Sequence, residues 1–233
     1  MGQKVRPTGF RTGIFLPWQS TWFAGKKDFA ELLFEDQKIR KFIHGRYKGS
    51  GISKVRIERT REKVVVVILT SKVGVIIGKK GQEVEKLTKD LETLCHRHIE
   101  VKTIEIARPE VDAQLVSQEI AEQLAKRASF RRVTKRALET TMEAGAKGIK
   151  VQLSGRLGGA EMARTEGAMA GSVPLSTLRA KVEFGFTEAV TGQGNIGVKV
   201  WINNGDFLTE ETIDGPDAKA GKVSKKPTRQ NKR

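Results

Sequence analysis

In the first half of the chain, the spacing of apolar residues is typical of a helix in some segments and of a strand in others. Apolar positions three and four residues apart predict a helix over residues 28–47, with Asp28 at its N-cap. Residues 52–57 largely alternate, and residues 64–69 are continuously apolar and β-branched, as in a strand covered on both faces. Residues 60–63 fit a hairpin loop between these two strands. The apolar stripe of the helix consists of Phe29, Leu32, Leu33, Ile39, Phe42 and Ile43.

A second helical pattern follows a turn that contains two glycines. Apolar residues recur at i, i+3, i+4 and i+7 over residues 84–95, which predicts a helix directly after the segment 75–82. A strand from 99 to 106 closes this unit, and Pro109 marks a boundary because the residue before a proline resists the helical conformation. The predicted order in the first half is therefore helix, strand, strand, glycine turn, helix, strand.

The second half also mixes helices with strands, and the chain has no internal sequence repeat. Helices are predicted over 111–127 and 130–144, the latter with Ser129 at its N-cap. The turn 155–159 leads into a short helix predicted from Ala160. Strands are predicted near 148–153, 175–186 and 195–201. Together these patterns predict two α+β domains.

The charge of the chain points to an anionic partner. Its 233 residues include 43 Lys+Arg and 27 Asp+Glu, which gives a formal net charge of +16, and 38% of them are apolar, enough for a folded core. The longest apolar run, 64–69, is far shorter than the roughly 18–20 residues of a membrane span, so no membrane partner is expected. Nucleic acid is favoured over an acidic membrane surface, since neither terminus contains an amphipathic basic helix.

The two ends of the chain are expected to be irregular. Residues 1–27 are punctuated by Gly and Pro and predict an arm with aromatic anchors. Residues 211–233 predict a disordered basic tail, because 215–233 contain seven Lys+Arg, one acid and no aromatic residue. The single cysteine, Cys95, and the lack of a signal-peptide pattern favour a cytoplasmic location. The candidate anchors of the arm are Trp18, Trp22 and Phe23.

The turn Gly78-Lys79-Lys80-Gly81 is the strongest candidate binding site. Two glycines let the backbone approach a partner closely, and the lysines and the N–H groups of the next helix attract anions. The turn is not a Walker loop, because Lys80 stands where a hydroxyl residue would bind magnesium, and residue 76 is not the glycine of a dinucleotide fingerprint. A G-x-x-G turn between two helices is the clamp that holds about four backbone nucleotides in a KH domain. The alternative is an ordinary solvent-exposed turn, which the order of the surrounding elements disfavours.

Seven motifs distributed over the chain are long enough to indicate a family. They occupy residues 1–11, 20–24, 75–81, 130–132, 145–151, 154–161 and 197–202. In these motifs the chain resembles the family of bacterial small-subunit ribosomal protein S-three, which contains a type II KH domain. The resemblance extends over roughly residues 1–210, and the tail is not covered. The segment 167–172 departs from the aromatic and basic residues that the family has at what is predicted here as the end of a helix.

The resemblance implies a structural, RNA-binding role in the small ribosomal subunit. It implies a place in the lower head, contact with small-subunit ribosomal RNA, positioning of messenger RNA, and a tight cluster with proteins S-ten and S-fourteen. No cofactor is expected. The chain is accordingly divided into an arm (1–27), a helix leading into the KH domain (28–38), a type II KH domain (39–107), a C-terminal α+β domain (108–210) and the tail (211–233).

The predicted helix 130–144 carries a second candidate surface. At 100° per residue its apolar positions fall on one side and its cations on the other. The cations are Arg131, Arg132, Lys135 and Arg136. Like charges at i and i+4, such as Arg131 and Lys135, cost about 0.2–0.5 kcal/mol, so an anionic partner is favoured over a merely solvated face. The resemblance implies that Arg131, Arg132 and Lys135 grip messenger RNA where it enters the subunit and help to part its paired regions.

Weaker signals leave alternatives open. Arg156 in the turn 155–159 is a further RNA candidate, although a purely structural turn fits the pattern equally well. Cys95, His96 and His98 fall short of the three or four converging ligands of a metal site, so no metal is expected. No catalytic constellation supports an enzyme. The alternatives are a free KH-domain regulator of messenger RNA and a nuclease acting at abasic sites.

Overall fold

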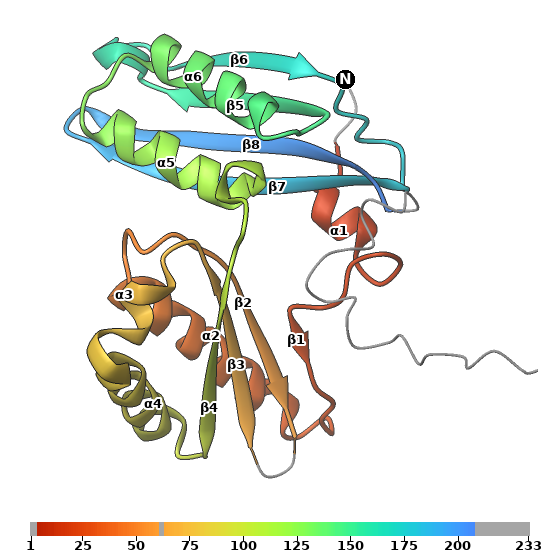
Figure 1. The fold of residues 1–233 in the computed structure, drawn as a ribbon, viewed down its shortest axis with the longest axis vertical. Helices are drawn as coiled ribbons and strands as arrows, with labels where there is room; N and C mark the ends of the chain where they lie inside the picture. Colours follow the sequence, from red (N-terminus) through yellow and green to blue (C-terminus); the bar gives the residue numbers. More distant parts are fainter. Residues whose placement is uncertain (1–3, 61–62, 208–233) are drawn as a thin grey trace, which may run out of the picture.

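The computed structural model describes residues 4–60 and 63–207, and the predicted disordered tail lies outside them. Within this range two four-stranded sheets are each covered by helices, and the two units lie one above the other (Figure 1). Each unit has its own cluster of buried apolar residues. The predicted α+β class is confirmed.

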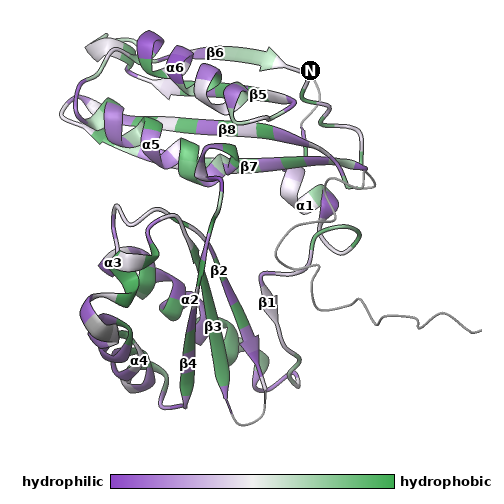
Figure 2. Cartoon of the chain, viewed as in Figure 1, coloured by the Kyte–Doolittle hydropathy of each residue, from purple (hydrophilic) through white to green (hydrophobic). Residues whose placement is uncertain are grey.

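The first unit follows the order of a type II KH domain. Its sheet runs β1-β2-β3-β4, with β2 and β3 antiparallel and β3 and β4 parallel. The strands are β1 (Ser20–Thr21), β2 (Ile52–Arg59), β3 (Val64–Thr70) and β4 (Ile99–Glu105). The helices are α2 (Phe29–Arg46), α3 (Val73–Ile77) and α4 (Gln82–Cys95). The predicted helix, strand, strand, glycine turn, helix, strand is present, and β3 is among the most apolar ribbons in Figure 2.

The strand β3 is buried along both faces, as its continuous apolar run predicts. Val64, Val66 and Ile68 face the helices and are at most 3% exposed. Val65 and Val67 point to the opposite face and are still buried. The charged side chains of the two neighbouring strands flank them there, because directly paired residues share a face of the sheet.

The helix α2 departs from its predicted apolar stripe. Ile39 and Ile43 enter the core, but Phe29 and Leu33 stay exposed. The buried position one turn before Ile39 is Asp36, whose carboxylate faces Arg59 of β2 rather than an apolar core. Asp28 occupies the predicted N-cap position, yet its side chain makes no capping hydrogen bond.

The second unit is an antiparallel sheet in the order β6-β5-β8-β7. Its strands are β5 (Gly148–Gly155), β6 (Arg164–Gly171), β7 (Ala180–Thr191) and β8 (Gly194–Asp206). The helices α5 (Ala113–Ala125) and α6 (Phe130–Glu143) cover one face (Figure 1). The strand predicted at 175–186 is displaced toward the C-terminus. The aspartate Asp112 caps α5 by accepting hydrogen bonds from the backbone N–H groups of Gln114 and Leu115.

The short helix predicted from Ala160 is wrong. A single 3-10 turn, η3 (Leu157–Gly159), is followed by the edge strand β6, so residues 167–171 of the segment 167–172 belong to a strand and not to a helix end. Four of its six residues are Gly or Ala, and within it only Ala170 packs against the core. Apolar and polar residues alternate in a strand when one of its faces is buried. Because β6 buries so little, it lacks this alternation, and the sequence pattern does not reveal it.

The N-terminal arm makes hydrogen bonds with both units. Arg11, at the end of α1 (Pro7–Arg11), is completely buried and donates hydrogen bonds to the carbonyl oxygens of Ala180 (2.6 Å) and Thr177 (2.8 Å) of the second unit. Further along, Ser20 and Trp22 donate to the carboxylate of Asp36 in the first unit. Figure 1 shows the arm passing from α1 beside β7 down to β1.

Of the three aromatic anchors expected in the arm only Trp22 is not exposed, and Phe15, which is not among them, stacks on Phe207 with ring centroids 4.9 Å apart. Trp22 is held by Asp36 and lies 5.2 Å from the ring of Phe29, whereas Trp18 and Phe23 are exposed. The other principal anchor, Arg11, has no signal in the sequence, because a single arginine in a basic arm looks like any other exposed cation.

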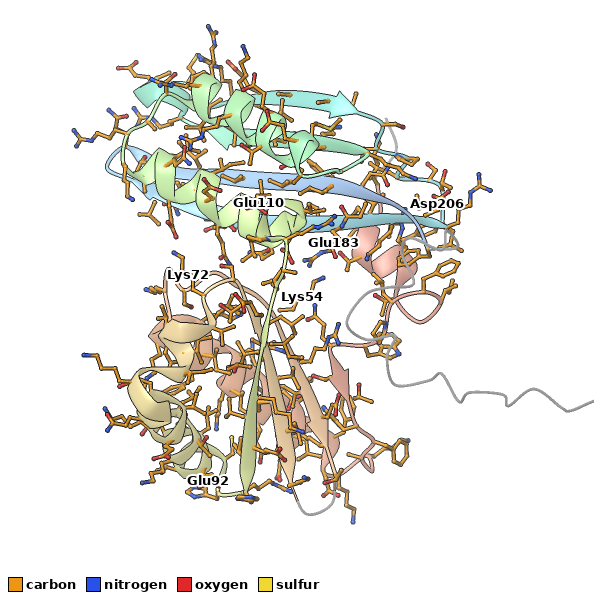
Figure 3. The ribbon with its side chains drawn as sticks, viewed as in Figure 1. Lys54, Lys72, Glu92, Glu110, Glu183 and Asp206 are labelled. Carbon is orange, nitrogen blue, oxygen red and sulfur yellow. The ribbon has the colours of Figure 1, made fainter. Side chains whose placement is uncertain are left out.

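Polar contacts join the two units directly. Ser53 of β2 donates to Asp112 at 2.5 Å, and Gln118 of α5 donates to the carbonyl of Ile52 at 2.9 Å. Lys54 and Glu183 face one another across the junction at 3.2 Å (Figure 3). Burial disfavours the charge of Lys54, but the carboxylates of Glu183 and Asp112 outweigh it and raise the pKa of Lys54. The junction therefore fixes the glycine turn and helix α6 relative to each other.

Candidate RNA-binding surfaces

The glycine turn forms the whole connection between α3 and α4. Gly78 ends α3 with φ +70° and ψ −172°, and Gly81 has the left-handed φ of +81°. Lys79 and Lys80 lie between them in one 3-10 turn, and the Lys79 side chain is exposed. The predicted G-x-x-G turn between two helices is thus present, with a backbone that a partner can approach.

The turn combines positive charge with an apolar rim. No side chain caps the start of α4, so its first N–H groups are available to an anion. Glu83 in the first turn of α4 is engaged by Lys86 at 3.1 Å and Arg46 at 3.8 Å, which weakens its repulsion of a phosphate. Val75 and Ile77 of α3 are exposed beside the turn. Sequence periodicity missed these two residues, because it assigns apolar side chains to a core.

Replacing Gly78 by Ala should destabilise the chain more than replacing Gly81. The backbone of Gly78 lies in a region that costs other residues about 1–3 kcal/mol, and an added Cβ would stand 2.6 Å from Cγ of Glu83. At Gly81 the left-handed conformation costs about 1–2 kcal/mol, and no atom lies within 4 Å of the added Cβ. Urea unfolding of the two variants measures the difference, and equal losses would contradict a packing role for Glu83 at this turn.

Helix α6 presents the predicted cationic surface. Its apolar side packs on the second core through Val133, which is buried, and through residues such as Ala137 and Leu138, which are partly buried. The four cations, which we call the α6 plate, are all exposed: Arg131, Arg132, Lys135 and Arg136. Lys135 lies 3.8 Å from Glu139, a distance at which an exposed pair contributes little.

One cation of this surface is not on the helix. Arg164, the first residue of β6, places its guanidinium 5.7 Å from the ring centroid of Phe130, and Arg131 lies at the same distance from that ring. The helix and the edge strand thus share one aromatic ring between two arginines. Sequence analysis missed Arg164 because it did not predict β6.

Arg156 serves the structure of its own turn. It donates to the carbonyl oxygens of Ala160 at 2.8 Å and Gln193 at 3.1 Å, so it ties the turn after β5 to the β7–β8 hairpin. The flanking Gly158 and Gly159 have left-handed φ values of +66° and +83°. Arg156 as a whole is half-buried, and its contact with RNA stays a prediction.

The described residues give no support to metal or membrane sites. No group of three or more His, Cys, Asp or Glu side chains among residues 4–60 and 63–207 is arranged to hold a metal ion. Cys95 is buried, which raises the pKa of its thiol, whereas His96 and His98 are exposed. Over the same residues, no helix has both the length and the apolar character needed to cross a membrane.

Comparison with known proteins matches both units to described families. The KH domain family matches residues 38–111, and the family "Ribosomal protein S3, C-terminal domain" matches residues 120–202. The chain is 56% identical to small ribosomal subunit protein uS3 of Rhodopirellula baltica over the full length of both chains. It is 52% identical to the uS3 protein of Desulforudis audaxviator, over 90% of this chain and 96% of the relative. The identity to that of Spiroplasma citri is 49%, over 94% and 88%.

Proposed function

Because the chain belongs to the family of small ribosomal subunit protein uS3, we propose that it binds ribosomal RNA in the lower head of the subunit and contacts messenger RNA where it enters. As a member of this family the chain is a ribosome-bound, cytoplasmic RNA-binding protein and not an enzyme. The observation that carries the RNA contact is the G-x-x-G turn held between two helices with its backbone open.

The glycine turn supplies the proposed clamp on an RNA backbone. The two glycines keep side chains away from the strand, so phosphates reach the N–H groups at the start of α4. Lys79 adds a mobile positive charge, and we assign the same role to Lys80. Val75 and Ile77 are exposed beside the turn and form an apolar surface against which the bases of the bound strand can pack. The KH domain of the proposal comprises residues 39–107, and the preceding segment 28–38 forms the first part of helix α2.

The α6 plate and Arg164 supply the proposed grip on messenger RNA. Arg131, Arg132 and Lys135 project from a helix whose other side is fixed in the core, so their charges keep a constant position relative to the subunit. A guanidinium can bind two oxygens of one phosphate, which favours holding a separated strand. Arg136 belongs to the same surface, and Arg156 would extend it at the end of β5. Any parting of strands is driven by the translating ribosome.

The exposed apolar residues of the arm and α2 supply the proposed contact with neighbouring proteins. Phe29 and Leu33 lie one turn apart on the exposed side of α2, and Phe23 of the arm and Phe34 are also exposed. Exposed large apolar side chains gathered in one patch mark interaction sites, protein contacts among them. We propose that proteins S-ten and S-fourteen cover this surface.

Exchanging Lys79 and Lys80 for aspartate should weaken binding of the full chain to single-stranded RNA. Each lost phosphate contact should flatten the slope of log K against log salt by about 0.7, because fewer counterions are released. Titrations at several salt concentrations measure this slope. The matched control is Lys38→Asp with Lys41→Asp, which makes the same charge change at two exposed positions of α2. If both variants have the affinity of the unchanged protein at low salt, the turn is not an RNA clamp.

A further inference from the structure

The second sheet has an open face that no described element covers over most of its area. Helices α5 and α6 lie on one side, where Ile149, Val151 and Val200 are completely buried. The residues that alternate with them point to the other side. Of this outer face only the end next to α1 is closed, where Val182 is buried.

Two rows of side chains cross this outer face from β6 to β7. Residues paired directly across antiparallel strands share a face, so the register places each row. The first row is Met169, Lys150, Trp201 and Phe184. The second row is Gly167, Gln152, Lys199 and Phe186. All eight residues are exposed or half-buried, and Met169 and Phe186 are 63% and 41% exposed.

The outer face mixes aromatic rings with cations. The rings of Trp201 and Phe184 are 5.4 Å apart and inclined by 52°, and Nζ of Lys150 lies 5.4 Å from the Trp201 centroid. The guanidinium of Arg6, in the arm, lies 5.0 Å from the centroid of Phe184. The two rows contain two lysines, Lys150 and Lys199, and no acid, and the nearest acid along β7 on this face, Glu188, belongs to the next row.

This composition selects one class of partner. Flat sheets with aromatic side chains and flanking cations bind unpaired nucleotides, because every base has a face that stacks on a ring while phosphates pair with the cations. Lysine is depleted at the centre of protein–protein interfaces, whereas here Lys150 and Lys199 lie among the aromatic rings. Four strands about 4.8 Å apart give a width suited to two or three nucleotides.

We propose that the outer face of the second sheet binds single-stranded RNA. Bases stack on Phe186 and Trp201, and Lys150 and Lys199 pair with the phosphates. The inference rests on the proposed function in taking RNA as the partner. The proposed RNA-binding surface is separate from the glycine turn and lies on the face of the sheet opposite to α6.

The test removes one ring and one charge from exposed positions of the full chain. Phe186→Leu with Lys199→Gln should weaken binding of fluorescein-labelled decauridine about tenfold, the effect of losing one stacked base. The titration is made in the Lys79→Asp, Lys80→Asp background, so that the glycine turn does not mask the change. The matched control is Phe10→Leu with Lys38→Gln, the same replacements at two exposed positions outside the outer face, Phe10 being 40% exposed, and it should leave the affinity unchanged.

The possible results separate this inference from the proposed function. If replacing Phe186 and Lys199 leaves the affinity for RNA unchanged while the glycine-turn variant binds more weakly, the inference is overturned and the proposed function stands. Equal losses in the control variant also overturn it, because the effect would then be one of overall charge. Failure of the unchanged protein to bind any RNA overturns both. In assembled small subunits, ultraviolet light should crosslink Phe186 or Trp201 to RNA, and crosslinks to a protein would overturn the inference.

Discussion

Asp36→Ala should lower the free energy of unfolding by about 3–5 kcal/mol, the loss expected when one partner of a buried ion pair is removed. The carboxylate of Asp36 is completely buried and accepts hydrogen bonds from Arg59, Ser20 and Trp22. Its removal leaves the guanidinium of Arg59, which is 5% exposed, with a single carboxylate partner, Glu35 at 2.7 Å. We expect a loss near the lower end of the range for this reason. Urea unfolding of the full chain, followed by tryptophan fluorescence, measures it.

A matched control for this prediction is Glu35→Ala on the same helix. Glu35 is 21% exposed, and Arg59 keeps Asp36 when Glu35 is lost. Glu35 also keeps more contact with water than Asp36 does, so the control should cost less. If Asp36→Ala costs no more than Glu35→Ala, the carboxylate is not the anchor that joins the arm to α2. Release of the arm would also appear as faster proteolysis between β1 and α2 in the Asp36 variant than in the control.

The joint replacement of Arg131, Arg132 and Lys135 by Ala should slow translation selectively. Ribosomes with this variant should assemble, because the apolar side of α6 is untouched. They should slow or stall where the message ahead of them is a stable duplex, and should read unpaired messages almost normally. A fixed cationic surface helps most where strands must be separated and held. Elongation rates on paired and unpaired templates measure the effect.

The folded chain itself should change little in this triple variant. Removing the like-charge pair of Arg131 and Lys135 gains about 0.2–0.5 kcal/mol, while losing the contact of Arg131 with Phe130 costs about 0.5–1 kcal/mol. The control variant replaces Lys38, Lys41 and Lys89, three exposed lysines of α2 and α4, by Ala. Equal slowing on both templates, or slowing by the control as well, would show that the α6 plate does not grip the incoming strand.

Elements that bury a strong local pattern could be predicted from the sequence. The run of β-branched residues in β3 is buried on both faces, and α4 and α6 bury the apolar sides that their periodicity indicates. The glycine turn lies between two helices as expected, because Gly78 and Gly81 adopt backbone conformations that other residues avoid. In each case the cause of the structure lies within a few neighbouring residues.

Only the tertiary structure decided the features that join distant parts of the chain. Arg11 meets Ala180, and Asp36 meets Arg59 and Trp22, so buried charges stand where the sequence shows only polar residues. The edge strand β6 and the aromatic outer face likewise depend on strand register, which brings Lys150, Trp201 and Phe184 into one row. Local propensity identifies elements because it acts between near neighbours. Partners of a buried charge or a sheet face are chosen by how whole elements pack, and the sequence pattern of one element does not contain that information.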